Sequence, residues 1–260
     1  MLGPALFTPE PRKFKKIYLE KWFWDCRKNR EFRNTPVQPF ESLEGKVDLE
    51  IIKSFQIVWD YLGQPGNWWT GDERLAIAEE VRSSNPKKIW EKVGNLEDYS
   101  KRTEATLSSY EKAVVRLVAN ETSAIDKATF DGISAFMGDN KYAELAAIIS
   151  QIVPIDHLFD SLGIEREKLP IAIEGQLSFE RPSELVEGVA FLPTFSTHGL
   201  PHVAVSLSLA QADNARRMLL VRAMYSGSSF GEMIWEHRNL SRPQIELVAA
   251  RTSALNECFY

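Results

Sequence analysis

Three helix-start motifs constrain what this 260-residue chain can fold into. In each motif a serine or threonine is followed three positions later by glutamate or glutamine. Such a pair can satisfy the free backbone amides at the beginning of a helix, as a capping box. The motifs are Thr70 to Glu73, Ser108 to Glu111 and Ser241 to Gln244. Aliphatic residues follow each motif, so the sequence predicts a helix at all three places.

Helical spacing of apolar residues continues through most of the chain. The expected helices cover residues 47–62, 74–83, 112–119, 129–137, 142–162, 206–225 and 230–237, with a last one from 241. Gly63, Gly138 and Gly163 are suited to end three of them, and Pro154 should bend the longest one. Residues 168–199 are richer in Pro, Gly and Ser and predict an irregular connection. Because strand patterns are scarce, we expect an all-α fold.

The composition indicates a soluble globular protein, with 44% hydrophobic and 26% charged residues. The formal net charge of −5 gives no global reason to expect nucleic acid or a membrane as a partner. No apolar run approaches the roughly 18 residues of a membrane span, and the order of charges at the N-terminus does not suit a signal peptide. With only Cys26 and Cys258, a disulfide framework is not expected. We therefore expect a cytoplasmic protein, and no motif predicts a metal or cofactor.

Residues 1–46 differ from the rest of the chain because basic residues are interleaved with aromatic ones there. Such a composition can bind single-stranded nucleic acid by stacking and phosphate contacts. The alternative is an arm whose aromatic residues dock on the main body of the protein. Glu10, Glu20, Asp25 and Glu31 interrupt the basic field, which favours the second interpretation.

Two stretches of the sequence suggest an internal duplication. Residues 73–82 and 246–255 each follow a capping box, open with glutamate and continue with small and aliphatic residues. The predicted organisation is an arm at 1–46, a first repeat at 47–167, and a connection with a second repeat at 168–260.

The segment from Leu240 to Tyr260 resembles the approach to the Cys-x-x-Cys site of the alkylhydroperoxidase D-like, or carboxymuconolactone decarboxylase, superfamily. In that family a glutamate is followed twelve residues later by a cysteine, then after two residues by a second cysteine, and four positions later by a histidine. Glu246 and Cys258 have the spacing of the glutamate and the first cysteine. Residues 68–82, 142–145 and 155–163 also resemble the long, two-repeat members of this family.

The resemblance implies a thiol-dependent peroxidase that reduces hydroperoxides, is recharged by a thiol reductant protein and forms a homo-oligomer. It assigns Cys258 as the resolving thiol and Glu246 as the distal base of a proton relay, with His237 as a candidate supporting residue. In the first repeat, Asn85 and Lys88 occupy the cysteine positions, which implies a structural repeat. The resemblance assigns no role to Cys26 or to the other histidines. We expect His157 to pack or to form a hydrogen bond. We expect His198 and His202 to lie in the irregular connection.

The resemblance also places a second redox residue at position 261 and a histidine beyond it, after the last residue, Tyr260. Three explanations stay open: a fragment, a deliberate truncation, or a UGA codon that encodes selenocysteine. The position of the end, directly before the redox residue, favours the third. Glu246 and Cys258 would lie about 18 Å apart on one continuous helix, so we expect the helix to end near Asn256.

Each site residue also has a simpler interpretation. Cys258 fits a buried core cysteine, and Glu246 fits a solvated carboxylate in the first turn of a helix. On that view the chain is a non-catalytic helical scaffold or oligomerisation module. A third alternative is a lyase like carboxymuconolactone decarboxylase. The twelve-residue spacing inside a longer match favours the peroxidase.

Overall fold

The computed structural model describes residues 39–84, 106–197, 201–226 and 239–257. Within these ranges the protein is all-α, as predicted, and its only β-type pairing is an isolated bridge between Val186 and Thr194. The α-helices are α2 (Leu49–Leu62), α3 (Gly71–Ser83), α4 (Ser109–Asn120), α5 (Lys127–Met137), α6 (Asp139–Leu162), α7 (His202–Val205), α8 (Gln211–Val221) and α9 (Arg242–Leu255). The short elements are the 3-10 turns η1 (Glu41–Leu43), η4 (Thr122–Ala124) and η5 (Ser208–Ala210), and the π-helical turn η6 (Arg222–Ser226).

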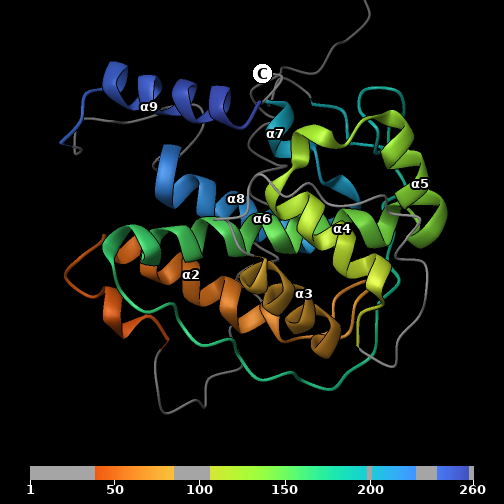
Figure 1. Ribbon diagram of the computed structural model, residues 1–260, viewed down its shortest axis with the longest axis horizontal. Helices are drawn as coiled ribbons and strands as arrows, with labels where there is room; N and C mark the ends of the chain where they lie inside the picture. The colour runs from red at the N-terminus through yellow and green to blue at the C-terminus, as the bar shows by residue number, and fades with distance from the viewer. Residues whose placement is uncertain (1–38, 85–105, 198–200, 227–238, 258–260) are drawn as a thin grey trace, which may run out of the picture.

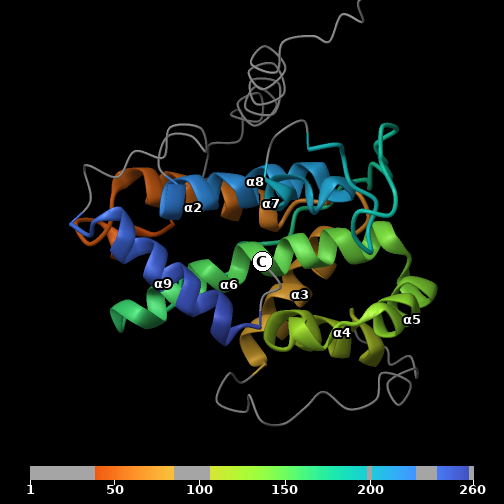
Figure 2. The same ribbon diagram turned by 90° about the horizontal axis from the view of Figure 1, so that it is seen from above.

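Helix α6 is the centre of the fold. It contacts α2, α3, α4, α5 and α8 and runs through the middle of the fold (Figure 1). Figure 2 shows it between the α2–α8 pair and the α3–α4 pair. Half of its residues are buried, among them Ile148, Ile152, Ile155 and Phe159. The helix continues through Pro154 without ending there. A core of this kind is stabilised mainly by removal of apolar surface from water.

By length and composition, α6 is also the one helix among the described residues that is apolar enough to cross a membrane. The sequence-based expectation that nothing approaches a span was therefore too strict. Because α6 is the central core helix and carries the buried Glu144, Gln151 and Asp156, its apolar character is explained by packing.

The three predicted capping boxes are confirmed. The Thr70 and Ser108 side chains accept a hydrogen bond from the backbone amides of Glu73 and Glu111, and each glutamate accepts the cap amide in return. Ser241 and Gln244 form the third box at the beginning of α9. The predicted helix ends at glycine are also confirmed.

The helix predicted at 206–225 is instead broken into η5, α8 and η6. The break coincides with Ser208, whose hydroxyl donates to the carbonyl of Val205 and accepts the backbone amide of Phe195. Local side-chain bonds of this kind compete with helical hydrogen bonding. His202 begins the short helix α7, so its predicted place in the irregular connection was wrong.

The predicted irregular connection runs along the surface of the helical core (Figure 1). The backbone amide of Ile173 donates to the carbonyl of Gly63, and that of Phe179 donates to the carbonyl of Asn67. The connection is thereby attached to the loop that separates α2 from α3.

The two helices of the proposed duplication, α3 and α9, have different surroundings. Helix α3 packs against α6 and α4, whereas α9 has no buried residue and makes only sparse contacts with the other described elements. Glu73 is the third residue of α3 and closes its capping box, but Glu246 is the fifth residue of α9. The duplication therefore stays a prediction that these surroundings do not support.

Candidate functional site

Glu246, the predicted base, lies on the second turn of α9. Its carboxylate accepts a hydrogen bond of 3.0 Å from the hydroxyl of Tyr225, and the Nε atom of Arg242 lies 3.6 Å from its other oxygen. The Glu246 side chain is 42% exposed, so it reaches solvent on one side. Tyr225 belongs to the π-helical turn η6, and such turns are frequent at functional sites. The carboxylate is therefore held between two elements, which a freely solvated side chain would not be.

Helix α9 ends where the predicted site requires it to end. Its last residue is Leu255, Asn256 is the C-cap, and Glu257 adopts a left-handed backbone conformation with a φ of 52°. The chain therefore turns away from the axis of α9 directly before Cys258. Cys258, His237, His198 and Cys26 lie outside the described residues.

A second constellation, which the sequence did not reveal, is a buried charge cluster formed by Arg74, Glu144 and Asp213. The guanidinium of Arg74 donates to Glu144 Oε1 at 2.6 Å and to the two oxygens of Asp213 at 2.8 and 3.1 Å. None of the three side chains is more than 3% exposed. The cluster connects α3, α6 and α8, and Arg74 Nε also donates to the carbonyl of Leu62 at the end of α2.

Further side chains complete the hydrogen bonding of this cluster. Glu144 accepts the backbone amide of Trp68 at 2.8 Å, and Gln151 donates its amide to Asp213 at 3.1 Å. The ring of Tyr61 lies 3.4 Å from the guanidinium carbon of Arg216 and 4.7 Å from that of Arg74. Burial of charge is costly unless each charge is paired and hydrogen-bonded, and here the pairing is nearly complete.

Burial shifts the ionisation of the groups in the cluster. Burial and the charge of Asp213 raise the pKa of Glu144 to about 7 and that of Tyr61 to about 12. Burial alone would lower the pKa of Arg74, but the charge and hydrogen bonds of Asp213 raise it above the usual arginine value. Arg74 is therefore charged at every physiological pH, while the protonation of Glu144 changes near neutrality.

The cluster is best explained as part of the core. Its three charged side chains are buried and paired with one another, and the described ranges contain no group of three or more His, Cys, Asp or Glu side chains that could hold a metal ion. One signal in the sequence could have revealed it. Glu144 stands between Ala143 and Leu145 and three positions before Ala147, in a segment that is otherwise apolar. A charged residue within such a segment of a core helix requires a partner.

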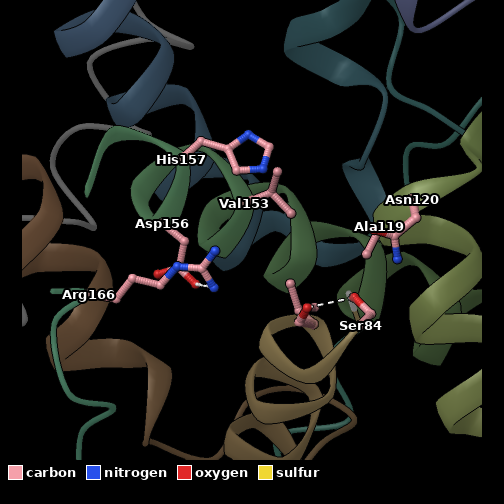
Figure 3. Close-up of a pocket in the computed structure, with 8 residues that line it drawn as sticks. Ser84, Ala119, Asn120, Val153, Asp156, His157 and Arg166 are labelled. Atoms are coloured by element: carbon pink, nitrogen blue, oxygen red, sulfur yellow. Dashed lines mark hydrogen bonds and ion pairs between the residues drawn. The ribbon is translucent and has the colours of Figure 1, made fainter. Parts of the chain in front are cut away.

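A small pocket lies between the C-terminal ends of α3 and α4 and the second half of α6 (Figure 3). Its walls are formed by Val81, Ser84, Ala119, Asn120, Val153, Asp156, His157 and Arg166. Asp156 accepts two hydrogen bonds from Arg82, at 2.8 and 2.7 Å. The cavity volume of about 30 Å³ holds about two water molecules. This is far below the roughly 300 Å³ of small metabolite sites, so the pocket does not define a substrate site.

His157 does not have the role in packing that the sequence suggested. Its side chain is exposed and lies at the wall of this pocket. Helix α6 presents its buried face through Ile155, Asp156 and Phe159, and His157 points away from that face.

No protein-family model, curated protein or solved structure matches this chain. The assignment to the alkylhydroperoxidase D-like superfamily therefore stays a prediction from the sequence.

Proposed function

We propose that this protein is a thiol- or selenol-dependent peroxidase that reduces hydroperoxides, with Cys258 as the resolving thiol and Glu246 as the base. The observation that carries the proposal is the position of Glu246. Its carboxylate is held by Tyr225, on a helix that ends three residues before Cys258. Because α9 ends at Leu255, Cys258 does not have to continue along the same helix, on which the two residues would be about 18 Å apart.

The proposed chemistry proceeds in two steps. A thiolate or selenolate at position 261 attacks the terminal oxygen of the hydroperoxide, and the O–O bond breaks. The remainder of the hydroperoxide leaves as an alcohol, and the attacking group becomes a sulfenic or selenenic acid. The Cys258 sulfur then attacks this atom, so that a disulfide or selenenyl sulfide forms and water is released. A thiol reductant protein returns two electrons and restores both groups.

Within this scheme Glu246 receives the proton of the attacking group through a relay. A base that is correctly placed contributes about 10²–10⁴-fold to a rate. The hydroxyl of Tyr225 fixes the direction of one carboxylate oxygen. Because the side chain is still partly exposed, a proton can pass from it to solvent.

We expect Glu246→Gln to lower hydroperoxide turnover about 100-fold or more in the protein continued past Tyr260 with cysteine at 261 and histidine at 265. Glutamine has the same shape and can still accept the Tyr225 hydroxyl, but it cannot take up a proton. Peroxide consumption with dithiothreitol as reductant measures the effect. The matched control is Glu257→Gln, which removes an exposed charge next to Cys258. Equal turnover in the Glu246→Gln variant and the unchanged protein would contradict the role of Glu246 as base.

A second candidate function, a non-catalytic oligomerisation module, is favoured by the exposed face of α9. Leu247, Val248 and Leu255 are 72%, 60% and 66% exposed, and α9 buries no residue of its own. Sedimentation at micromolar concentration distinguishes the two candidates when it is combined with the turnover measurement: an oligomer without peroxidase activity favours the module.

A further inference from the structure

The surface of the connection between α6 and α7 carries exposed apolar and exposed acidic side chains. We define the connector patch as Ile171, Ile173, Glu174, Phe179 and Glu180. Ile171 is 88% exposed, Phe179 60% and Ile173 51%. These are large values for apolar side chains, and they occur within nine residues of one extended segment. Exposed apolar surface that is gathered in one region commonly marks a binding site.

The acidic charges of this connection are not balanced by basic residues within the connection itself. Residues 169–191 contain four glutamates (174, 180, 184 and 187) and one basic residue, Arg181, so their net charge is −3. All four glutamates are exposed. None of these four glutamates forms an ion pair with another residue that the structure describes. The connector patch therefore suits a partner that is both aromatic or aliphatic and positively charged.

The N-terminal arm has this chemistry. Residues 1–38 contain nine Lys or Arg and four Asp or Glu, a net charge of +5, together with seven aromatic residues. Basic and aromatic residues are interleaved along residues 12–33, so a docked arm can present both kinds of side chain to one surface.

The arm also leaves the described structure beside the connection. The backbone amide of Phe40 donates to Glu167 Oε2 at 2.7 Å, and the indole of Trp59 donates to the carbonyl of Lys168 at 2.8 Å. The ring of Phe40 is fully buried against Phe55, Trp59 and Phe159. The arm therefore ends two positions before Phe40, which is buried and hydrogen-bonded to Glu167. Ile171 of the connector patch follows Glu167 by only four residues.

We infer that residues 1–38 dock on the connector patch of the same chain, with aromatic side chains on Ile171, Ile173 and Phe179 and with Lys or Arg side chains paired with Glu174 and Glu180. The reach is ample, because Glu167 and Glu180 are separated by at most about 45 Å of extended chain, whereas 38 residues span up to about 130 Å. Tethering next to the patch gives the arm a high effective concentration there. This docking does not depend on the chemistry at Cys258.

Limited digestion of the full chain with chymotrypsin tests the inference, because this protease cuts after the aromatic residues that would be covered. Mass spectrometry follows the cuts after Phe14, Tyr18, Trp22, Trp24 and Phe32. We expect slow cleavage in the unchanged protein and at least about fivefold faster cleavage in Glu174→Lys/Glu180→Lys. The control Glu184→Lys/Glu187→Lys makes the same change of charge further along the connection and should leave the rate unchanged. Ile171→Asp, at a highly exposed position that the core does not need, should also accelerate cleavage.

Three results would overturn the inference. The arm of the unchanged protein could be cut as fast as a free peptide of the same sequence. The reversal at Glu174 and Glu180 could leave the cleavage rate unchanged while circular dichroism shows an intact helical core. Protection that increases with protein concentration would show that the arm docks on a second copy of the chain. Faster cleavage of the unchanged protein at high salt, where ion pairs are screened, is an additional expected result.

Discussion

Replacement of Arg74 by methionine is expected to lower the free energy of unfolding by about 3–5 kcal/mol, the usual loss when one partner of a buried ion pair is removed. Arg74 is 1% exposed and is the shared partner of Glu144 and Asp213. Methionine retains most of the apolar stem but leaves both carboxylates without that partner. Urea unfolding followed by circular dichroism measures the change.

Arg82→Met is the matched control for this experiment. Arg82 also makes two hydrogen bonds to a buried aspartate, Asp156. However, the Arg82 side chain is 19% exposed, and Asp156 has Arg166 at 3.5 Å as a second partner. We expect a loss of only about 1 kcal/mol, typical of partly exposed pairs. Equal losses in the two variants would show that the buried cluster stabilises the fold no more than the partly exposed pair of Arg82 and Asp156.

Stability should decrease as the pH rises from about 4.5 to about 7, because of Glu144. Burial and the charge of Asp213 raise its pKa in the folded protein from 4.5 to about 7. A carboxyl with a raised pKa contributes stability that is fully present below the pKa of the unfolded chain. This contribution is lost as the pH rises through the pKa of the folded state. The expected loss is on the order of 3–4 kcal/mol, since the pKa rises from 4.5 to about 7 and each pKa unit corresponds to about 1.4 kcal/mol.

Glu144→Gln should remove this pH dependence, because an amide does not ionise. The groups that surround Glu144 are Arg74 on α3, Asp213 on α8, Tyr61 on α2 and the backbone amide of Trp68. Tyr61 and Arg74 do not titrate in this range, since burial raises the pKa of Tyr61 to about 12 and Asp213 raises that of Arg74 above its usual value. Urea unfolding at several pH values between 4.5 and 8 gives the two profiles. Parallel profiles for the variant and the unchanged protein would assign the titration to another group.

The local structure of this protein follows closely from its sequence. The capping boxes at Thr70, Ser108 and Ser241 each depend on two side chains three positions apart, so they can be recognised without knowledge of the tertiary fold. The same holds for Gly138 and Gly163, which adopt a positive φ at the ends of α5 and α6. The end of α9 at Leu255 was also predicted, from the distance that the proposed chemistry requires.

Features that depend on distant residues were not predicted. The partners of Arg74 are 70 and 139 positions away along the chain, and no periodicity connects them. The beginning of η5 coincides with Ser208, whose hydroxyl accepts the amide of Phe195, thirteen residues earlier. The hydrogen bond from Tyr225 to Glu246 belongs to the same class. It joins a π-helical turn to α9, and neither the turn nor its direction follows from the local sequence.

The redox state of Cys258 after one equivalent of hydroperoxide tests the proposed function most directly. The measurement uses the protein continued past Tyr260 with cysteine at 261, and intact and peptide mass spectrometry after alkylation of free thiols. Reduction of the peroxide should be accompanied by loss of the free Cys258 thiol and by a bond between Cys258 and residue 261, and dithiothreitol should reverse both. If peroxide is consumed while Cys258 stays fully alkylated, or if no peroxide is consumed at all, the proposed function is wrong.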